Sequence, residues 1–376
     1  MLHQTKNTST YGKLKTYYWL GALLSPNSKN TFTEEIRQDL ILKKINWNIL
    51  FQICDSQLII PSVYLALIRR QLLSFVPVKY LEHFEKVYLL NRKRNENILK
   101  QINEITPLLN KNGIEPVFIK GSGNLLDNLY CDIGERFLID IDFLVPDSQF
   151  LSTTKLLEAN GYKSLSPDWP GATEWTKHYP RLENPEYSTT VEVHRLLADP
   201  PFHKYFNYDF IKDKRHRPAG KNFGCYVFSD EYKAIHNFIH SQLNDRGHYR
   251  TNSSFRQMYD FMLLLSKPGV QQELQKFKRY KQKLRCYKRI TEEIFLLPHK
   301  RRWFPDISYL IFQFSFNFML RSEKWRGIVY SKDNFIRPIM YYLRAVSKAL
   351  VERDYRKRHI KRLLHKYSPS VLYLRK

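Results

Sequence analysis

Hydrophobic residues recur at helical spacing through the first third of the chain. Between Glu34 and Leu109 they fall three or four positions apart, as in Leu50, Phe51 and Cys54, so each group lines one face of a helix. A proline and an Asn-Gly pair punctuate the end of this stretch near residue 110. We therefore predict a helical N-terminal arm over residues 1–110.

The pattern then changes to short β-rich runs separated by helices. Strands are expected at residues 115–119, 137–145 and 189–196, and helices at 123–130 and 150–160. Helical spacing returns beyond Asp230. We predict an α+β fold in which the helical arm is followed by a small mixed-sheet core at 111–229 and a helical, strongly basic C-terminal domain at 230–376.

Composition supports a folded protein with an anionic partner. The 376 residues include 24 Phe, 25 Tyr and 6 Trp, which a disordered chain would not carry. The formal net charge is +25, and residues 271–376 hold 27 Lys and Arg against 8 Asp and Glu. Such an excess favours acidic or phosphate-bearing partners.

Cysteine usage and hydropathy favour a cytoplasmic protein. The four cysteines are far apart, so neither a disulfide framework nor a Cys-based zinc site is indicated. The longest apolar run, residues 307–320, is shorter than the roughly 20 residues of a membrane span and predicts a buried helix. Residues 17–24 weakly resemble a signal peptide, but Pro26 follows in place of a cleavage site.

Three carboxylates are placed for metal chemistry. Asp140 and Asp142 are two apart in an apolar strand, so they project from one face and repel each other unless a cation binds. Glu192, between Val191 and Val193, becomes a third ligand if the two strands are neighbours. Oxygen ligands select Mg²⁺ or Mn²⁺. The plainer interpretation is that the aspartates mark the solvent face of an edge strand.

A turn upstream has the composition of a phosphate-binding site. Lys120, Gly121 and Ser122 join an expected strand to a helix; the glycine permits close approach, the serine can cap the helix, and the lysine adds charge. Arg136 is either a second phosphate contact or a solvated loop residue. Asp140 and Asp142 follow one strand later. Together with them, the turn predicts a site for a nucleoside triphosphate whose metal ions bind to the carboxylates.

These segments resemble a known family of enzymes. In chain order they are Lys120-Gly121-Ser122, Arg136, residues 139–145 and residues 191–194. They resemble the nucleotidyltransferase superfamily that includes DNA polymerase beta, tRNA CCA-adding enzymes and antibiotic adenylyltransferases. More narrowly, the chain is similar to a bacterial family of uncharacterised nucleotidyltransferases over residues 40–265, which makes 111–229 the nucleotidyltransferase core.

The resemblance implies attack of an acceptor hydroxyl on the α-phosphate of a nucleoside triphosphate, with release of pyrophosphate. Two Mg²⁺ or Mn²⁺ ions would be held by Asp140, Asp142 and Glu192. Glu192 would also take the hydroxyl proton, while the turn residues and Arg136 hold the triphosphate. His194, two residues after Glu192, is a candidate acceptor-side group or a simple hydrogen-bonded strand histidine.

The sequence departs from the superfamily pattern in two places. The third acid is Glu192 where Asp is common, and 18 residues separate Ser122 from Asp140, more than in the smallest members. The resemblance therefore indicates the type of reaction more specifically than it indicates the acceptor molecule.

Two further pairs lie one helical turn apart. His236 and His240 have zinc-protease spacing, but Asn237 stands where the catalytic Glu would be. We interpret this segment as a helix lining the cleft. Arg256 and Asp260 are predicted to form a surface ion pair.

The basic C-terminal region leaves several partners open. It mixes aromatic residues with Lys and Arg, as in surfaces that dock RNA or another phosphorylated acceptor. Residues 353–366 also have the pattern of a basic amphipathic helix for peripheral attachment to an anionic membrane, and a solvated basic face is the plainest interpretation. The acceptor class stays open among a small molecule, a polysaccharide intermediate, a protein side chain and an RNA end, as do the choice of nucleotide and the oligomeric state.

Two other functions compete with nucleotidyl transfer. One is a glycosyltransferase that holds a nucleotide-sugar through Mn²⁺ on its Asp-x-Asp pair, although such enzymes usually begin with an αβ sheet rather than a helical arm. The other is a non-catalytic basic module that binds nucleic acid or a protein partner.

Overall fold

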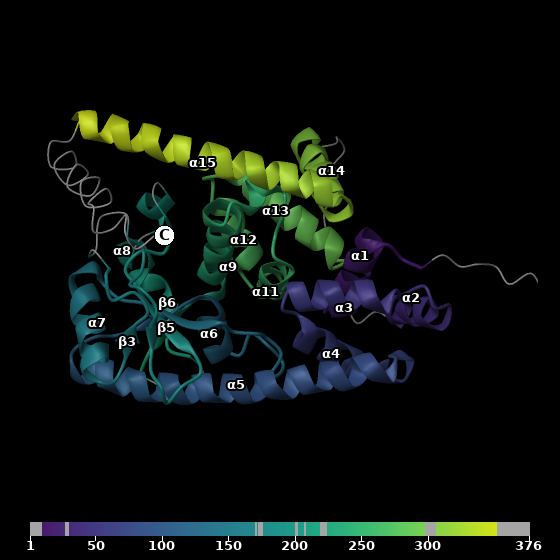
Figure 1. The fold of residues 1–376 in the computed structure, drawn as a ribbon, viewed down its shortest axis with the longest axis horizontal. Helices are drawn as coiled ribbons and strands as arrows, with labels where there is room; N and C mark the ends of the chain where they lie inside the picture. The colour runs from purple at the N-terminus through teal and green to yellow at the C-terminus, as the bar shows by residue number, and fades with distance from the viewer. Residues whose placement is uncertain are drawn as a thin grey trace, which may run out of the picture. The chain divides into compact units, whose positions relative to one another are not determined.

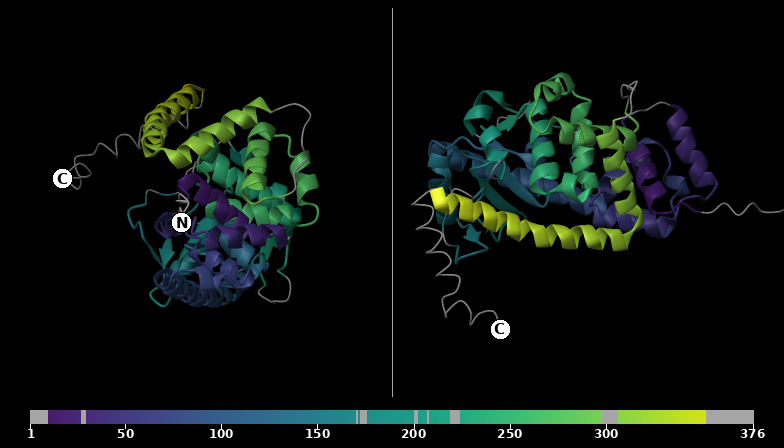
Figure 2. Two further views of the ribbon diagram at one scale, coloured as in Figure 1. Left: turned by 90° about the vertical axis from the view of Figure 1, so that its right-hand side faces the viewer. Right: turned by 90° about the horizontal axis from the view of Figure 1, so that it is seen from above.

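The computed structural model describes residues 10–26, 30–169, 171, 176–199, 202–206, 208–218, 224–297 and 306–351. The chain forms two compact units, residues 1–321 and residues 322–376. The first contains the sheet and most helices (Figure 1). The described part of the second is one long helix, α15 (Glu323–Val351), shown in yellow in Figure 2.

The N-terminal arm is helical, as the hydrophobic spacing predicts. Its elements are α1 (Lys13–Leu24), α2 (Asn30–Ile41), α3 (Trp47–Ser56), α4 (Ile60–Arg69), the short η1 (Leu73–Phe75) and α5 (Val78–Lys111). The side chain of Asn46 caps α3 by accepting a hydrogen bond from the Ile49 amide at 3.2 Å. Pro107 does not end α5, which continues for another turn.

A mixed seven-stranded sheet forms the core, and its strand order is β3-β4-β5-β2-β1-β7-β6. The central strands β2 and β5 run parallel, with Asp142 opposite Glu192. β1 and β7 are also parallel, whereas the other neighbours are antiparallel. The strands are β1 (Val117–Phe118), β2 (Asp140–Leu144), β3 (Lys163–Ser164), β4 (Leu182–Glu183), β5 (Thr190–His194), β6 (Arg215–His216) and β7 (Tyr226–Phe228). The predicted α+β class is confirmed.

Further helices of the first unit lie between the strands in the sequence and after the last strand. Around the strands these are α6 (Lys120–Leu126), η2 (Asp147–Gln149), α7 (Phe150–Ala159), η3 (Phe202–Tyr205), α8 (Tyr208–Ile211) and η4 (Lys212–Lys214). After them come α9 (Asp230–Phe238), η5 (Ile239–Asn244), α10 (Gly247–Arg250), α11 (Phe255–Leu265), α12 (Val270–Lys276), α13 (Lys281–Ile294) and α14 (Ile307–Arg321). α9 packs against α6, α11 and α12, so the segment beyond residue 230 shares a core with the sheet. The division of the chain at residues 110 and 229 stays a prediction.

The prediction of a buried helix over residues 307–320 is only half right. One face of α14 is buried through Tyr309, Phe312, Phe316 and Met319, but Phe314 on the other face is 72% exposed. Apolar residues lie all round this helix, and the core covers only one side. Across the described ranges, no helix is long and apolar enough to span a membrane. The basic segment 353–366 lies outside the described residues.

Gly123 in α6 is needed where the helix crosses the end of β1. A Cβ atom at this position would lie 2.5 Å from the carbonyl oxygen of Phe118. We expect Gly123→Ala to lower the free energy of unfolding by about 1–3 kcal/mol, the usual cost of overpacking, measured by urea denaturation. Gly12→Ala is the matched control, because no atom lies within 4 Å of its added Cβ. Equal stabilities of the two variants would contradict the prediction.

Candidate active site

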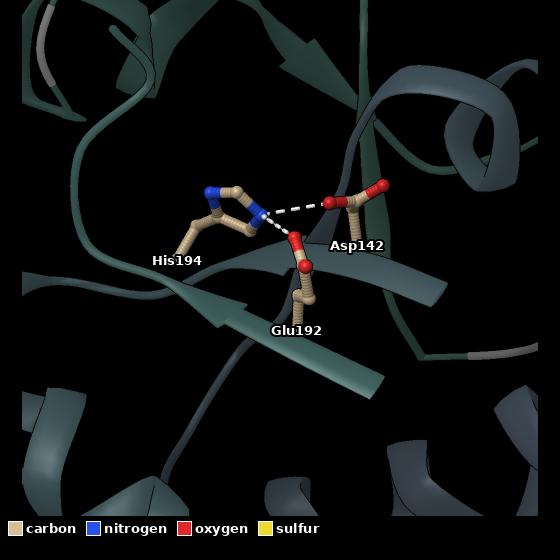
Figure 3. Close-up of side chains that lie close together, drawn as sticks. All are labelled: Asp142, Glu192 and His194. Carbon is tan, nitrogen blue, oxygen red and sulfur yellow. Dashed lines mark hydrogen bonds and ion pairs between the residues drawn. The ribbon is translucent and has the colours of Figure 1, made fainter. Parts of the chain in front are cut away.

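A buried cluster of Asp142, Glu192 and His194 lies where β2 and β5 run side by side (Figure 3). Nε2 of His194 is 2.7 Å from Oδ1 of Asp142 and 3.3 Å from Oε2 of Glu192. The parallel register places Asp142 beside Glu192, and His194 follows two residues later, so all three share one face of the sheet. The two strands are thus neighbours, which is the condition under which the sequence makes Glu192 a candidate third ligand.

Two basic side chains complete the cluster. Nζ of Lys120 is 2.5 Å from Oδ1 of Asp142 and 3.9 Å from Oε2 of Glu192. Arg181 joins Asp140 to the cluster, because its Nη2 is 3.1 Å from Asp140 Oδ2 and its Nε is 2.9 Å from Glu192 Oε1. With His194, the groups that bind these carboxylates come from three separate segments of the chain.

Arg181 was not identified from the sequence. It precedes β4 in a stretch without a recognisable motif, and it reaches Glu192 because Leu182 of β4 pairs with Val191 of β5. Only the antiparallel register of these two strands gives this contact.

The three carboxyl groups have different proton affinities. Burial and the neighbouring Asp142 raise the pKa of Asp140 to about 7. Burial would also raise the pKa of Asp142, but Lys120 and His194 hold it well below its usual range. Glu192 is likewise buried, yet the hydrogen bond from His194 lowers its pKa to about 2. At neutral pH Asp142 and Glu192 are therefore ionised, and Asp140 exchanges its proton near pH 7.

The donor atoms of this cluster suit a divalent cation. One oxygen each from Asp142 and Glu192 and one nitrogen of His194 all lie within 4.8 Å of one another. Asp140, linked through Arg181, is at the edge of the same group. Carboxylate oxygens suit Mg²⁺ and Mn²⁺, and the imidazole adds a donor that Mn²⁺ accepts more readily than Mg²⁺.

The turn between β1 and α6 contributes to the site differently from the prediction. Lys120 and Gly121 line the cavity described below. Ser122 is fully buried, and its hydroxyl bonds the Ile119 and Asp142 backbone rather than capping the helix, whose N-cap is Ile119. Ser122 therefore ties α6 to β2. Its predicted role in triphosphate binding stays a prediction.

Helix α5 holds the loop that leads into β2. Nδ2 of Asn91 donates to the Gly134 and Arg136 carbonyls at 2.7 and 3.1 Å, and Nδ2 of Asn95 donates to those of Ile133 and Arg136 at 2.6 and 2.8 Å. Both asparagines are buried. These bonds fix the backbone just ahead of the two aspartates.

Glu135 anchors the same loop from the other side. Its buried carboxylate is bound by Arg69 of α4 at 3.1 Å and by the hydroxyl of Tyr259 of α11 at 2.5 Å. Ser62 donates to its backbone carbonyl at 2.8 Å. The arm and α11 therefore meet at one residue of this loop.

Arg136 forms a buried ion pair, and the expected surface pair between Arg256 and Asp260 is wrong. Nη2 of Arg136 is 2.7 Å from Oδ2 of Asp260, whose carboxylate also accepts from the Tyr130 hydroxyl at 2.9 Å. The helical spacing does place Arg256 and Asp260 on one face of α11, but that face packs against the loop carrying Arg136. Arg256 instead donates to the Phe137 carbonyl at 3.1 Å.

A cavity of ≈ 350 Å³ opens over the carboxylates. The sheet side contributes Lys120, Asp140, Asp142 and Glu192, and the opposite wall is formed by α9, η5 and α11. The side chains from this wall and from the loop before β4 are mostly polar: Lys177, His178, Lys233, His236, Asn237, His240, Asp245, Arg256, Gln257 and Asp260. The cavity joins the expected catalytic carboxylates to a polar surface from the helical region.

His236 and His240 line this cavity, which confirms their interpretation as cleft residues. His240 lies in η5, a π-helical segment that continues α9, and its Nδ1 is 3.1 Å from Oδ2 of Asp245. His236 is buried, and its Nε2 donates to the Leu197 carbonyl at 3.1 Å. Burial holds the pKa of His236 well below its usual range, so the folded protein keeps this ring neutral.

His236 should make the protein sensitive to acid. Below about pH 6.5 the unfolded chain binds a proton that the folded state excludes, so the free energy of unfolding falls by up to about 1.4 kcal/mol for each pH unit. His236→Gln keeps a donor for Leu197 but removes the titration. We expect its stability, measured by urea denaturation from pH 7 to 5, to fall less steeply than that of the wild type by about this slope. Parallel curves would contradict a buried neutral histidine.

Comparison with known proteins gives the class of the chain. The model of a family described as uncharacterised nucleotidyltransferase matches residues 43–301, which include the arm from α3 onward, the sheet, the carboxylate cluster and the cavity wall. The chain belongs to this family. No curated protein matches it. The narrower resemblance noted in the sequence is confirmed, while membership of the wider superfamily stays a prediction.

Proposed function

We propose that this protein transfers a nucleoside monophosphate from a nucleoside triphosphate to an acceptor hydroxyl and releases pyrophosphate. The observation that carries the proposal is the buried cluster of Asp142, Glu192 and His194, whose two carboxylates line one cavity together with Asp140, in a chain of a nucleotidyltransferase family. The family favours this function over a glycosyltransferase and over a non-catalytic binding module.

Asp140, Asp142 and Glu192 would hold Mg²⁺ or Mn²⁺, with His194 adding a nitrogen. Bound there, the metal ions would polarise the reacting phosphate and stabilise charge on the attacking and leaving oxygens. Two ions are expected, because Asp140 extends the carboxylate set beyond the compact cluster. Arg181 holds Glu192 and Asp140 in register, so the carboxylates are already oriented before the substrate arrives.

Lys120 and Glu192 have distinct roles in this proposal. Lys120 balances the charge of Asp142 across 2.5 Å and would contact the transferred phosphate. Glu192 is ionised at neutral pH and can accept the proton of the acceptor hydroxyl. His194 is only 1% exposed, so it acts within the carboxylate cluster rather than by touching the acceptor.

The acceptor is proposed to enter along the polar wall formed by η5 and α11. His240, Asp245 and Gln257 line that wall and hydrogen-bond to one another. Such a wall suits a hydroxyl-bearing polar molecule better than an apolar one.

Thermal unfolding with ATP, CTP, GTP and UTP tests the proposal directly. Each nucleotide is added with Mg²⁺, with Mn²⁺ and with a chelator. A ligand at 100 times its dissociation constant adds about 2.7 kcal/mol to stability, so at least one triphosphate should raise the melting temperature only when metal is present. Stabilisation by nucleotide-sugars but by no triphosphate would overturn the proposal in favour of glycosyl transfer. A folded protein stabilised by neither would favour a non-catalytic module.

A further inference from the structure

Among the residues that the structure describes, six cationic side chains line the cavity, and five of them have carboxylate partners. Lys120, Arg136, Lys177, Arg181 and Lys233 pair with Asp142, Asp260, Asp199, Asp140 and Asp127, respectively. Arg256 differs. Over the ranges of chain that the structure describes, no carboxylate oxygen lies within ion-pair distance of its guanidinium, although Asp260 is on the same helix.

The guanidinium of Arg256 is held in place by one hydrogen bond, and its buried Nε has no partner among the described residues. Nη1 donates to the Phe137 carbonyl at 3.1 Å, three residues before Asp140, which fixes the group beside the start of β2. Its Nε is buried and has no hydrogen-bond partner within the described part of the chain. A guanidinium offers five N–H donors in a planar fork that matches phosphate oxygens.

An unpaired cation in a partly buried place is unfavourable unless an anion comes to it. Burial and the neighbouring Arg136 lower the pKa of Arg256 to about 10. The side chain is therefore still charged at neutral pH. Arg136 takes both oxygens of Asp260, which leaves Arg256 without that carboxylate.

We propose that Arg256 binds the phosphate chain of the nucleoside triphosphate, and that Arg136, the residue suggested by the sequence, serves to position it. The inference rests on the proposed function, because it assigns the anion to that reaction's substrate. Arg256 lies on the helical wall facing the carboxylates, so a triphosphate on the metal ions would be held from both sides of the cavity. The Arg136–Asp260 ion pair fixes the position of α11 relative to the loop. It therefore also fixes how far the Arg256 side chain extends into the cavity.

The test compares binding of ATP, ADP, AMP and inorganic tripolyphosphate to wild type, Arg256→Gln and Arg256→Lys in the presence of Mn²⁺. Titration calorimetry should show ATP and tripolyphosphate binding about 10- to 100-fold more weakly to Arg256→Gln, the range for a charged hydrogen-bond pair. AMP binding should change by less than about twofold, and Arg256→Lys should recover part of the loss. Arg37→Gln, which removes the same charge from a half-buried arginine of α2 outside the cavity, is the matched control and should bind ATP as the wild type does.

A second measurement separates ligand binding from a structural role. Without nucleotide, Arg256→Gln should unfold at the same temperature as the wild type or a higher one, because it removes a partly buried charge that has no carboxylate partner among the described residues. A lower unfolding temperature together with equal losses of ATP and AMP would show a structural residue and overturn the inference, as would unchanged ATP binding. If the wild type itself binds neither ATP nor tripolyphosphate, the proposed function fails and the inference fails with it, an outcome distinct from failure of Arg256 alone.

Discussion

Asp142→Asn is expected to remove the metal-dependent stabilisation by nucleoside triphosphate, about 2.7 kcal/mol at 100 times the dissociation constant. Asp142 lies closer to Lys120 and His194 than Glu192 does, and it faces Glu192 across the central strand pair. The asparagine keeps the shape of the side chain but offers one neutral oxygen to a cation. The variant should therefore lose the binding of the metal and the binding of the nucleotide together.

The same substitution should lower nucleotidyl transfer at least about 100-fold, because polarisation by bound metal contributes several kcal/mol to such reactions and each 1.4 kcal/mol is a factor of ten in rate. Pyrophosphate release is the measurement. Asp147→Asn is the matched control, since its carboxylate is exposed, follows β2 and pairs with Arg195. A variant that keeps metal-dependent ATP binding would remove Asp142 from the metal site.

Breaking the ion pair between Arg136 and Asp260 should cost more stability than any exposed charge pair. Both side chains are buried, so Asp260→Leu leaves a guanidinium without a counter-ion and the Tyr130 hydroxyl without an acceptor. Loss of one partner of a buried pair typically costs about 3–5 kcal/mol. Urea denaturation of Asp260→Leu should show a loss in this range.

A double variant tests whether the stability comes from the interaction between Arg136 and Asp260. Arg136→Met with Asp260→Leu should be more stable than the sum of the single losses predicts, because no charge is left buried. Glu96→Gln, which breaks an exposed pair with Arg92 on α5, should change stability by less than about 1 kcal/mol. Additive losses in the cycle would show that Arg136 and Asp260 act independently.

The sequence predicts the elements of this site better than the contacts between them. Alternation of apolar and acidic residues was sufficient for β2 and β5, because the period of two is a local property of a strand. The helical arm and the role of His236 and His240 as cleft residues followed from spacing in the same way. Each of these patterns lies within one segment and is not changed by the rest of the chain.

The errors all concern packing between distant segments. Arg256 and Asp260 have ideal helical spacing, yet Arg136, 124 residues away, takes the carboxylate. Arg181 depends on strand register, and the exposed face of α14 depends on how far the core extends. Local spacing permits several partners for such groups, and burial decides among them.

The loop ahead of β2 limits how far the protein can be shortened. Asn91 and Asn95 of α5 supply the donors for its carbonyls. Arg69 balances the charge of its buried Glu135, and Tyr259 donates a hydrogen bond to the same carboxylate. A piece consisting of the sheet alone would lose all four groups at once. Such a fragment would carry Asp140, Asp142 and Glu192 on strands whose entry segment has neither its hydrogen bonds nor its charge balance. The helices before and after the sheet therefore belong to the smallest fragment that can hold this site together.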